Sequence, residues 1–143
     1  MEIALKQASF AAESGEIPVG AVVVSPEGVV LAQDGNRTRV GNDPTAHAEM
    51  NVIRQACALL GQERLTGCDL YVTLEPCAMC ATAIAHARIA RVYYGASDPK
   101  SGGVECGARV FEHPQSHHKP QVYSGIAQQD CEVLLKAFFA GLR

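Results

Sequence analysis

Residues 69–96 are "DLYVTLEPCAMCATAIAHARIARVYYGA", and their pattern is typical of one class of fold. The first six and the last six residues are rich in β-branched and aromatic side chains, which favour strands. Between them, Glu75-Pro76 opens a stretch through about Arg88 that is predicted to be helical. A strand, a helix and a further strand are therefore expected in succession.

Two further elements lie toward the N-terminus. The stretch "PVGAVVVSPEGVVLAQDG" (18–35) has two β-branched runs around Pro26-Glu27-Gly28, which is a hairpin pattern. Residues 2–14 predict a helix that ends at Gly15. The side chains of this helix that are expected to face a core are Ile3, Ala4, Ala8, Ala11 and Ala12.

A second helix is predicted in "NDPTAHAEMNVIRQACALLG" (42–61). Proline favours the first turn of a helix and glycine the position after its end, so Pro44 is expected to open this helix and Gly61 to close it. The spacing of its apolar residues predicts one buried stripe. The stripe consists of Met50, Ile53, Cys57 and Leu60.

The C-terminal part predicts a short helix with loops in "GGVECGARVFEHP" (102–114) and a short strand in "PQVYSGI" (120–126). Residues 129–142 predict a closing amphipathic helix. Its apolar residues are Leu134, Leu135, Phe138 and Phe139. Strands alternating with helices indicate a three-layer α/β/α fold, here one domain over residues 1–143. The leading hairpin makes the expected five-stranded sheet mixed.

Composition excludes several classes of protein. Of the 143 residues, 48% are hydrophobic and 19% are charged, as in ordinary globular proteins. No stretch approaches the roughly 18 apolar residues of a membrane span, so no membrane partner is expected. The charges scattered through the first 16 residues do not suit a signal peptide, and a cytoplasmic location is expected. A net charge of −3 argues against a generic basic nucleic-acid binder, but a local basic patch remains open.

Cysteine usage points to a metal. Cys77 and Cys80 lie three apart, directly after Pro76, where a strand is expected to meet a helix. Such a pair could be a redox couple, half of a structural zinc site, or half of a catalytic one. Helix N-termini carry free N–H groups and partial positive charge, which favour thiolates. The remaining cysteines are assigned to packing and are Cys57, Cys68, Cys106 and Cys131.

A second motif, "HAE" at 47–49, supplies an imidazole and a carboxylate. His47 with Cys77 and Cys80 makes a sulfur, sulfur, nitrogen donor set that suits zinc. On a regular helix, His47 and Glu49 would point roughly 200° apart. The two side chains can still converge if the metal lies just beyond the end of the helix.

Three protein ligands leave a fourth tetrahedral position for water, which is the arrangement of a catalytic zinc. Zinc lowers the pKa of such a water toward neutrality. Hydrolysis of an amino-substituted ring then needs a group that carries a proton from the water to the departing ammonia. Glu49 is the candidate for this proton transfer.

The pairing of "HAE" with "PCAMC" (76–80) resembles the motif of the zinc nucleoside and nucleobase deaminases, which have a cytidine-deaminase-like fold. Five stretches along nearly the whole chain resemble the bacterial tRNA-specific adenosine deaminases of that family. They are "EIPVGAVVV", "DPTAHAE", "LYVTLEPCAMCA", "HARIARVYYGA" and "LLKAFF".

The resemblance implies conversion of adenosine to inosine at the wobble position of a tRNA anticodon loop, by a homodimer with one zinc ion per subunit. Carried over by position, His47, Cys77 and Cys80 would bind zinc, and Glu49 would move protons. The positions that it matches to substrate contacts are Asn36, His86, Asp98 and Lys100.

Several basic residues lie in or beside these motif segments, so a positive rim that suits RNA is predicted around the metal. They are Arg37, Arg39, Arg88, Arg91 and Lys100. A free base carries no phosphate and would gain little from such a rim.

Three alternatives compete with this interpretation. A structural zinc module would need a fourth ligand and would have no use for Glu49. A thiol-disulfide oxidoreductase would not need the His-x-Glu partner. A deaminase of a free base, such as guanine or cytosine, would carry the same motif and stays open.

Overall fold

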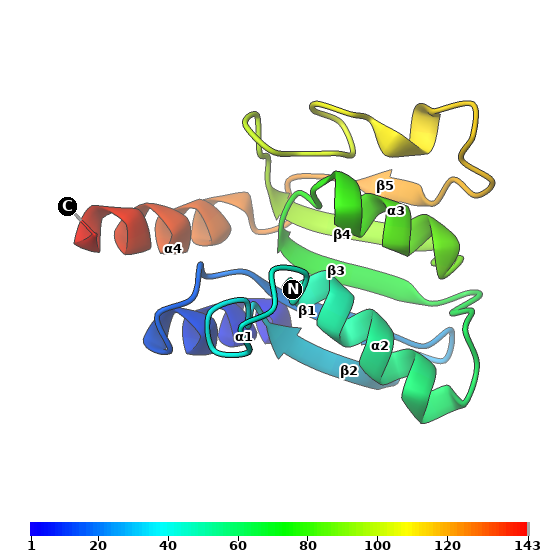
Figure 1. Cartoon of the computed structure of the whole chain (residues 1–143), viewed down its shortest axis with the longest axis horizontal. Helices are drawn as coiled ribbons and strands as arrows, with labels where there is room; N and C mark the ends of the chain where they lie inside the picture. Colours follow the sequence, from blue (N-terminus) through cyan, green and yellow to red (C-terminus); the bar gives the residue numbers. More distant parts are fainter. Residues whose placement is uncertain (143) are drawn as a thin grey trace.

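Five strands form one mixed sheet in the computed structural model, which describes residues 1–142. The strand order is β2-β1-β3-β4-β5 (Figure 1). Strand β1 pairs antiparallel with β2 and β3, whereas β3, β4 and β5 are parallel. The expected mixed sheet is confirmed. The strands are β1 (Gly20–Val24), β2 (Val30–Gly35), β3 (Asp69–Leu74), β4 (Arg91–Ala96) and β5 (Gln121–Tyr123).

Helices cover both faces of the sheet and complete the three layers (Figure 1). Helices α2 (Ala48–Leu60) and α3 (Ala78–His86) lie side by side on one face. Helices α1 (Glu2–Glu13) and α4 (Gln128–Gly141) pack on the other. The short helix expected after β4 is a single 3-10 turn, η1 (Val110–Glu112), which packs near α3. This confirms the three-layer α/β/α arrangement.

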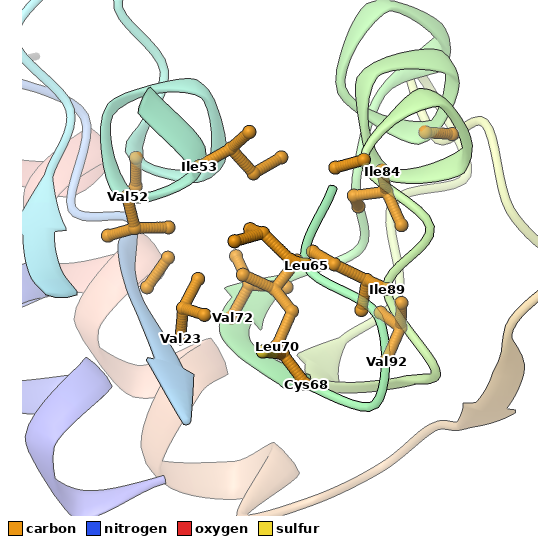
Figure 2. Close-up of a cluster of buried hydrophobic side chains, with 14 of the residues drawn as sticks. Val23, Val52, Ile53, Leu65, Cys68, Leu70, Val72, Ile84, Ile89 and Val92 are labelled. Carbon is orange, nitrogen blue, oxygen red and sulfur yellow. The ribbon is translucent and has the colours of Figure 1, made fainter. Parts of the chain in front are cut away.

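The main core lies between the sheet and the α2/α3 layer (Figure 2). Strand residues such as Val23, Leu70 and Val72 face Val52 of α2 and Ile84 of α3. All five are fully buried. Because this core fixes α2 and α3 against the sheet, it also fixes the positions at which both helices begin.

The buried stripe predicted for α2 is wrong in most of its members. Met50 and Cys57 are only partly buried, and Leu60 is 42% exposed. The buried face of α2 includes alanines, which approach the sheet more closely than larger side chains can, and a glutamate. A prediction based on the spacing of large apolar residues therefore could not find this face. The residues of α2 that are buried are Ala48, Glu49, Val52, Ile53 and Ala56.

Helix α1 lies directly on the first two strands. A Cβ atom added at Gly20 of β1 would lie 2.0 Å from the carbonyl oxygen of Ala4. Only small side chains fit such an approach, and α1 buries Ala4, Ala8 and Ala11. The expectation that Ile3 faces the core is wrong, because Ile3 is 38% exposed. Ala12, the fifth expected core residue, is only partly buried.

Helix α4 is held mainly at its start and extends past the sheet (Figure 1). Its one buried residue is Cys131, whose sulfur lies where a side chain on Gly95 of β4 would be. The predicted apolar face is only partly covered, since Phe139 is 45% exposed. Across residues 1–142, none of the helices has the length and apolar character needed to span a membrane.

Candidate metal centre

The predicted ligands meet at the N-terminal ends of α2 and α3. His47 and Cys77 each occupy the position just before a helix, with extended backbone conformations, and Cys80 lies in the first turn of α3. His47 Nδ1 lies 3.6 Å from Cys77 Sγ and 3.5 Å from Cys80 Sγ. The three ligand atoms all lie within 4.8 Å of one another. The structure therefore brings together the three side chains that the two motifs singled out.

The start of α2 differs from the prediction. Pro44 does not open the helix, which begins at Ala48. The preceding residues form a turn in which Asp43 Oδ1 accepts the N–H of Thr45 at 2.8 Å. Asn36, the residue directly after β2, caps α2 by accepting the N–H of Ala48 on its side-chain oxygen at 2.8 Å. Because His47 precedes the helix, the expected divergence between His47 and Glu49 does not arise.

The two thiols differ strongly in acidity. A hydrogen bond from Cys80, with a further contribution from His47, lowers the pKa of Cys77 to about 4. The same hydrogen bond and burial raise the pKa of Cys80 above its usual range. The bond to Cys77 in turn raises the pKa of His47. A divalent cation is the partner that lets both sulfurs ionise together, so this donor set fits zinc.

Glu49 lies two residues after the ligand His47 and is almost completely buried, at 3% exposure. Burial raises the pKa of Glu49 to about 7, against a smaller opposing effect of hydrogen bonding and of His47. A carboxyl group with such a pKa can both take up and release a proton near neutral pH. This property suits the predicted proton transfer.

Three other predicted site residues, Asp98, Lys100 and His86, do not lie together. Asp98 Oδ1 accepts the N–H groups of Lys100 and Ser101, at 3.1 and 3.0 Å, and so closes a turn after β4. Asp98 and Lys100 line a groove of about 730 Å³ together with Leu74, the last residue of β3. His86 is exposed at the far end of the nine-residue α3, about 14 Å from Cys77 at 1.5 Å per residue. The structure thus separates His86 from the metal ligands.

The positive rim is only partly formed around the metal centre. Arg37 and Arg39 follow β2 and lie in the loop that leads to His47. Arg88 and Arg91 follow the far end of α3, and Arg91 pairs with Asp69 at 2.7 Å. The expectation that all five basic residues surround the metal is therefore wrong for these two, because the direction of α3 carries them away.

No further cysteine joins the ligand group. Within residues 1–142, the only group of three or more potential metal-ligating side chains is His47, Cys77 and Cys80. The structural zinc alternative needs a fourth protein ligand and finds none among these residues. The remaining thiols are not in disulfide bonds and are Cys57, Cys68, Cys106 and Cys131.

Sequence analysis missed two buried carboxylates that hold loops beside the centre. Glu16, 1% exposed, accepts the N–H groups of Arg39 and Val40 at 2.7 and 2.9 Å. Glu75, 2% exposed, accepts backbone N–H groups from the segment after β4. The sequence did carry a signal for Glu75, because it is a charged residue directly before Pro-Cys at the end of an apolar strand. A charge at a buried position requires hydrogen-bond partners, so this position predicts that Glu75 holds other parts of the chain.

The family comparison agrees with this geometry. The model described as the cytidine and deoxycytidylate deaminase zinc-binding region matches residues 1–96, which is more than half of the chain. The chain therefore belongs to the cytidine and deoxycytidylate deaminase family.

Within that family, the chain is more similar to tRNA adenosine deaminases than to a guanine deaminase. A tRNA-specific adenosine deaminase of Agrobacterium fabrum is 60% identical over 97% of this chain and 91% of the relative. A structure from studies of A-to-I editing by tRNA:A34 deaminases at the wobble position of transfer RNA matches with a TM-score of 0.93 and 60% identity. That match covers 94% of this chain and 97% of the other. A guanine deaminase of Bacillus subtilis is more distant, at 33% identity and a TM-score of 0.66 over 98% and 89% of the two chains.

Proposed function

We propose that this protein is a zinc-dependent hydrolase that converts adenosine to inosine at the wobble position of a tRNA anticodon. One arrangement carries the proposal: the ligand atoms of His47, Cys77 and Cys80 lie within 4.8 Å of one another, and the buried carboxyl of Glu49 interacts with Cys80. The choice of adenosine in tRNA is supported by the 60% identity to a tRNA-specific adenosine deaminase.

His47, Cys77 and Cys80 would hold one zinc ion per chain. Nδ1 of His47 faces both sulfurs, and the lowered pKa of Cys77 makes its thiolate available at neutral pH. Bound zinc supplies Lewis-acid activation of water. Because the three ligands sit at two helix starts, the partial positive charge of those helix ends favours the two thiolates.

Glu49 would carry the proton. The net reaction consumes one water and releases one ammonia, so a proton must pass from water to the departing amino nitrogen. The pKa of Glu49, about 7 because of burial, lets the carboxylate accept this proton and the carboxylic acid return it. Its place in the first turn of α2, two residues after His47, keeps the carboxyl group at the ligand end of the helix.

RNA contacts are proposed for Asn36, Asp98 and Lys100, which lie in the loops beside the metal centre. Asn36 lies at the start of α2 through its bond to Ala48, next to His47. His86 would contact a part of the tRNA away from the target base, since α3 separates it from the metal centre.

The test offers the zinc-loaded protein an anticodon stem-loop with adenosine at the wobble position, and separately free adenosine, cytosine and guanine. Ammonia release and mass spectrometry of the base measure the reaction. We expect inosine in the stem-loop and little turnover of the free compounds. If guanine or cytosine reacts while the stem-loop is inert, the substrate assignment is wrong.

We further propose that residues 1–143 form one deaminase domain and that two copies associate as a homodimer in the cytoplasm. The family resemblance supports the dimer. Leu59 and Leu60, 65% and 42% exposed at the end of α2, are apolar side chains available for such a contact. Light scattering should give twice the mass of the chain, and the mass of one chain at micromolar concentration would contradict the dimer.

A further inference from the structure

Both ends of one loop converge on the carboxylate of Glu75. Its Oε1 accepts the N–H of Asp98 at 3.0 Å and the hydroxyl of Ser97 at 3.3 Å. Its Oε2 accepts three successive N–H groups, from Val104 at 3.2 Å and from Glu105 and Cys106 at 2.9 Å. One oxygen therefore holds the beginning of segment 97–106 and the other holds its end.

The closed segment lies directly against the turn that carries the first cysteine ligand. Cys77 and Gly102 form an isolated antiparallel bridge, and the N–H of Gly103 donates to the carbonyl oxygen of Pro76 at 2.8 Å. A Cβ atom on Gly103 would lie 2.5 Å from the nitrogen of Ala78, so the two backbones touch. The position of segment 97–106 is thus set relative to the metal ligands.

The exposed tip of the segment forms a wall of the groove described above. Ser97, Asp98, Lys100 and Ser101 line this groove of about 730 Å³. The opposite side includes the half-exposed ring of Phe139 from α4. The lining residues outside the segment are all apolar. The polar wall of the groove depends on the loop that Glu75 closes.

We propose that RNA lies in this groove beside the metal centre and that Glu75 is a positioning residue for it, because its carboxylate fixes segment 97–106 as one wall of the groove. This inference rests on the proposed function. Glu75 reaches the RNA only through the loop and is not a catalytic residue. Hydrogen bonds from N–H groups to a carboxylate are about twice as strong as those to a neutral acceptor. An amide at this place would also direct its own N–H₂ group toward backbone donors.

The kinetic test compares wild type with Glu75→Gln, both zinc-loaded, on the anticodon stem-loop. Loss of an outer partner that orients a metal ligand typically costs about 10- to 100-fold, and we expect a loop-holding partner to have an effect of similar size. We expect KM to rise by about tenfold or more, with kcat within about twofold and zinc content unchanged. Glu75→Asp keeps a carboxylate and should recover part of the loss, and it serves as the test if the glutamine variant does not fold.

The matched control for the kinetics is Glu112→Gln, which removes an exposed carboxylate that pairs with Arg109 at 2.8 Å. It should leave both constants at wild-type values. An unchanged KM in Glu75→Gln would overturn the proposal. So would a loss of zinc or a tenfold fall in kcat, because either result would assign Glu75 to the metal-ligand turn instead of the RNA.

Amide hydrogen exchange tests the tether without RNA. In Glu75→Gln, exchange at Glu105 and Cys106 should accelerate by at least tenfold, while Arg39 and Val40 keep their protection. In the matched variant Glu16→Gln the pattern should reverse, because Glu16 holds those two amides. Unchanged exchange at Glu105 and Cys106 would reject the role of Glu75. Accelerated exchange together with a wild-type protein that is inert on the stem-loop would instead reject the proposed function, and the RNA role with it.

Discussion

The start of α2 and the end of β3 each place a buried glutamate beside the candidate metal centre, and the two behave in opposite ways. Glu49 and Glu75 are 3% and 2% exposed. Burial raises the pKa of Glu49 to about 7. Burial also acts to raise the pKa of Glu75, but the N–H groups of Cys106, Asp98 and Glu105 outweigh it, and the pKa of Glu75 is lowered.

The difference shows that burial does not decide what a carboxylate does. Several backbone N–H groups directed at one carboxylate stabilise its charge, so that group stays ionised and holds a loop. A buried carboxylate with few such donors changes its protonation near neutral pH and can move protons. The same amino acid therefore has two roles beside one metal centre, at position 49 and at position 75.

The largest effect is expected from Glu49→Gln, which removes the carboxyl proposed to move the proton. The amide has nearly the same shape but cannot take up a proton, so kcat should fall by about two to four powers of ten. Zinc content and thermal stability should stay close to wild type. Single-turnover deamination of the stem-loop, with elemental analysis of the same sample, measures both.

A Glu49→Gln variant with near-normal turnover would mean that another group moves the proton. The contrast between a proton-transferring Glu49 and a loop-holding Glu75 would then be wrong. Loss of zinc in this variant would show that Glu49 supports the ligands themselves.

The metal ligands were predictable because each lies in a short motif at a helix start. His47 and the pair Cys77 and Cys80 meet because both helices begin at the same edge of the sheet, which the alternation of strands and helices already implied. The mixed sheet followed from β-branched runs and the hairpin turn. The sequence patterns that predict the ligands and the strands each lie within a short stretch of the chain.

Other features depend on contacts between distant segments and could not be predicted. The cap on α2 comes from Asn36, 12 residues before Ala48. The five bonds to Glu75 come from residues 22 to 31 positions away. The face that α2 buries depends on how closely alanines approach the sheet, and the rim was misjudged because the direction of α3 separates Arg88 from the metal centre.

The second prediction asks whether Glu16 behaves like Glu75. Burial acts to raise the pKa of Glu16, but N–H groups of Val40 and Arg39 and the hydroxyl of Thr38 outweigh it, and its pKa is lowered. Glu16→Gln should reduce the free energy of unfolding at pH 7 by about 1–3 kcal/mol, because the backbone donors lose a charged acceptor. Urea unfolding of zinc-loaded protein measures this difference.

The pH dependence of that difference tests whether the pKa of Glu16 is lowered or raised in the folded protein. A carboxyl group with a lowered folded-state pKa contributes stability above its unfolded value of 4.5 and loses it as pH falls through the folded value. The gap between wild type and Glu16→Gln should therefore shrink as pH falls below 4.5. A gap that grows on acidification would contradict the lowered pKa. Glu27→Gln, in the exposed turn between β1 and β2, is the control and should unfold like wild type at each pH.

The third prediction concerns a buried group with no proposed chemistry. Burial raises the pKa of Cys131 to about 11, so this thiol stays neutral, and its sulfur packs against Gly95. Cys131→Ala should lower the free energy of unfolding by about 1 kcal/mol, since it deletes one buried atom and leaves a small cavity. Zinc content should not change. Loss of zinc would show that this thiol reaches the metal.

The smallest effect is expected from the exposed charges beside the centre. Arg37 is 61% exposed and pairs with Asp34 at 2.9 Å, so part of its charge is already balanced. Arg39 donates to the carbonyl oxygen of Gly15, and its backbone is held by Glu16. Each phosphate contact contributes close to one to the slope of log K against log salt.

Replacing both Arg37 and Arg39 by alanine should therefore weaken stem-loop binding several-fold and reduce that slope by about one to two. Arg64→Ala, an exposed change beyond the far end of α2, is the matched control and should keep the wild-type slope. Fluorescence anisotropy across a salt series gives both quantities, with zinc content checked in each sample. An equal loss in the control would mean that overall charge drives binding, and an unchanged slope in the double variant would place the phosphates elsewhere. In either case the loop that Glu16 holds would have no direct part in RNA binding, and the segment held by Glu75 would remain the candidate wall.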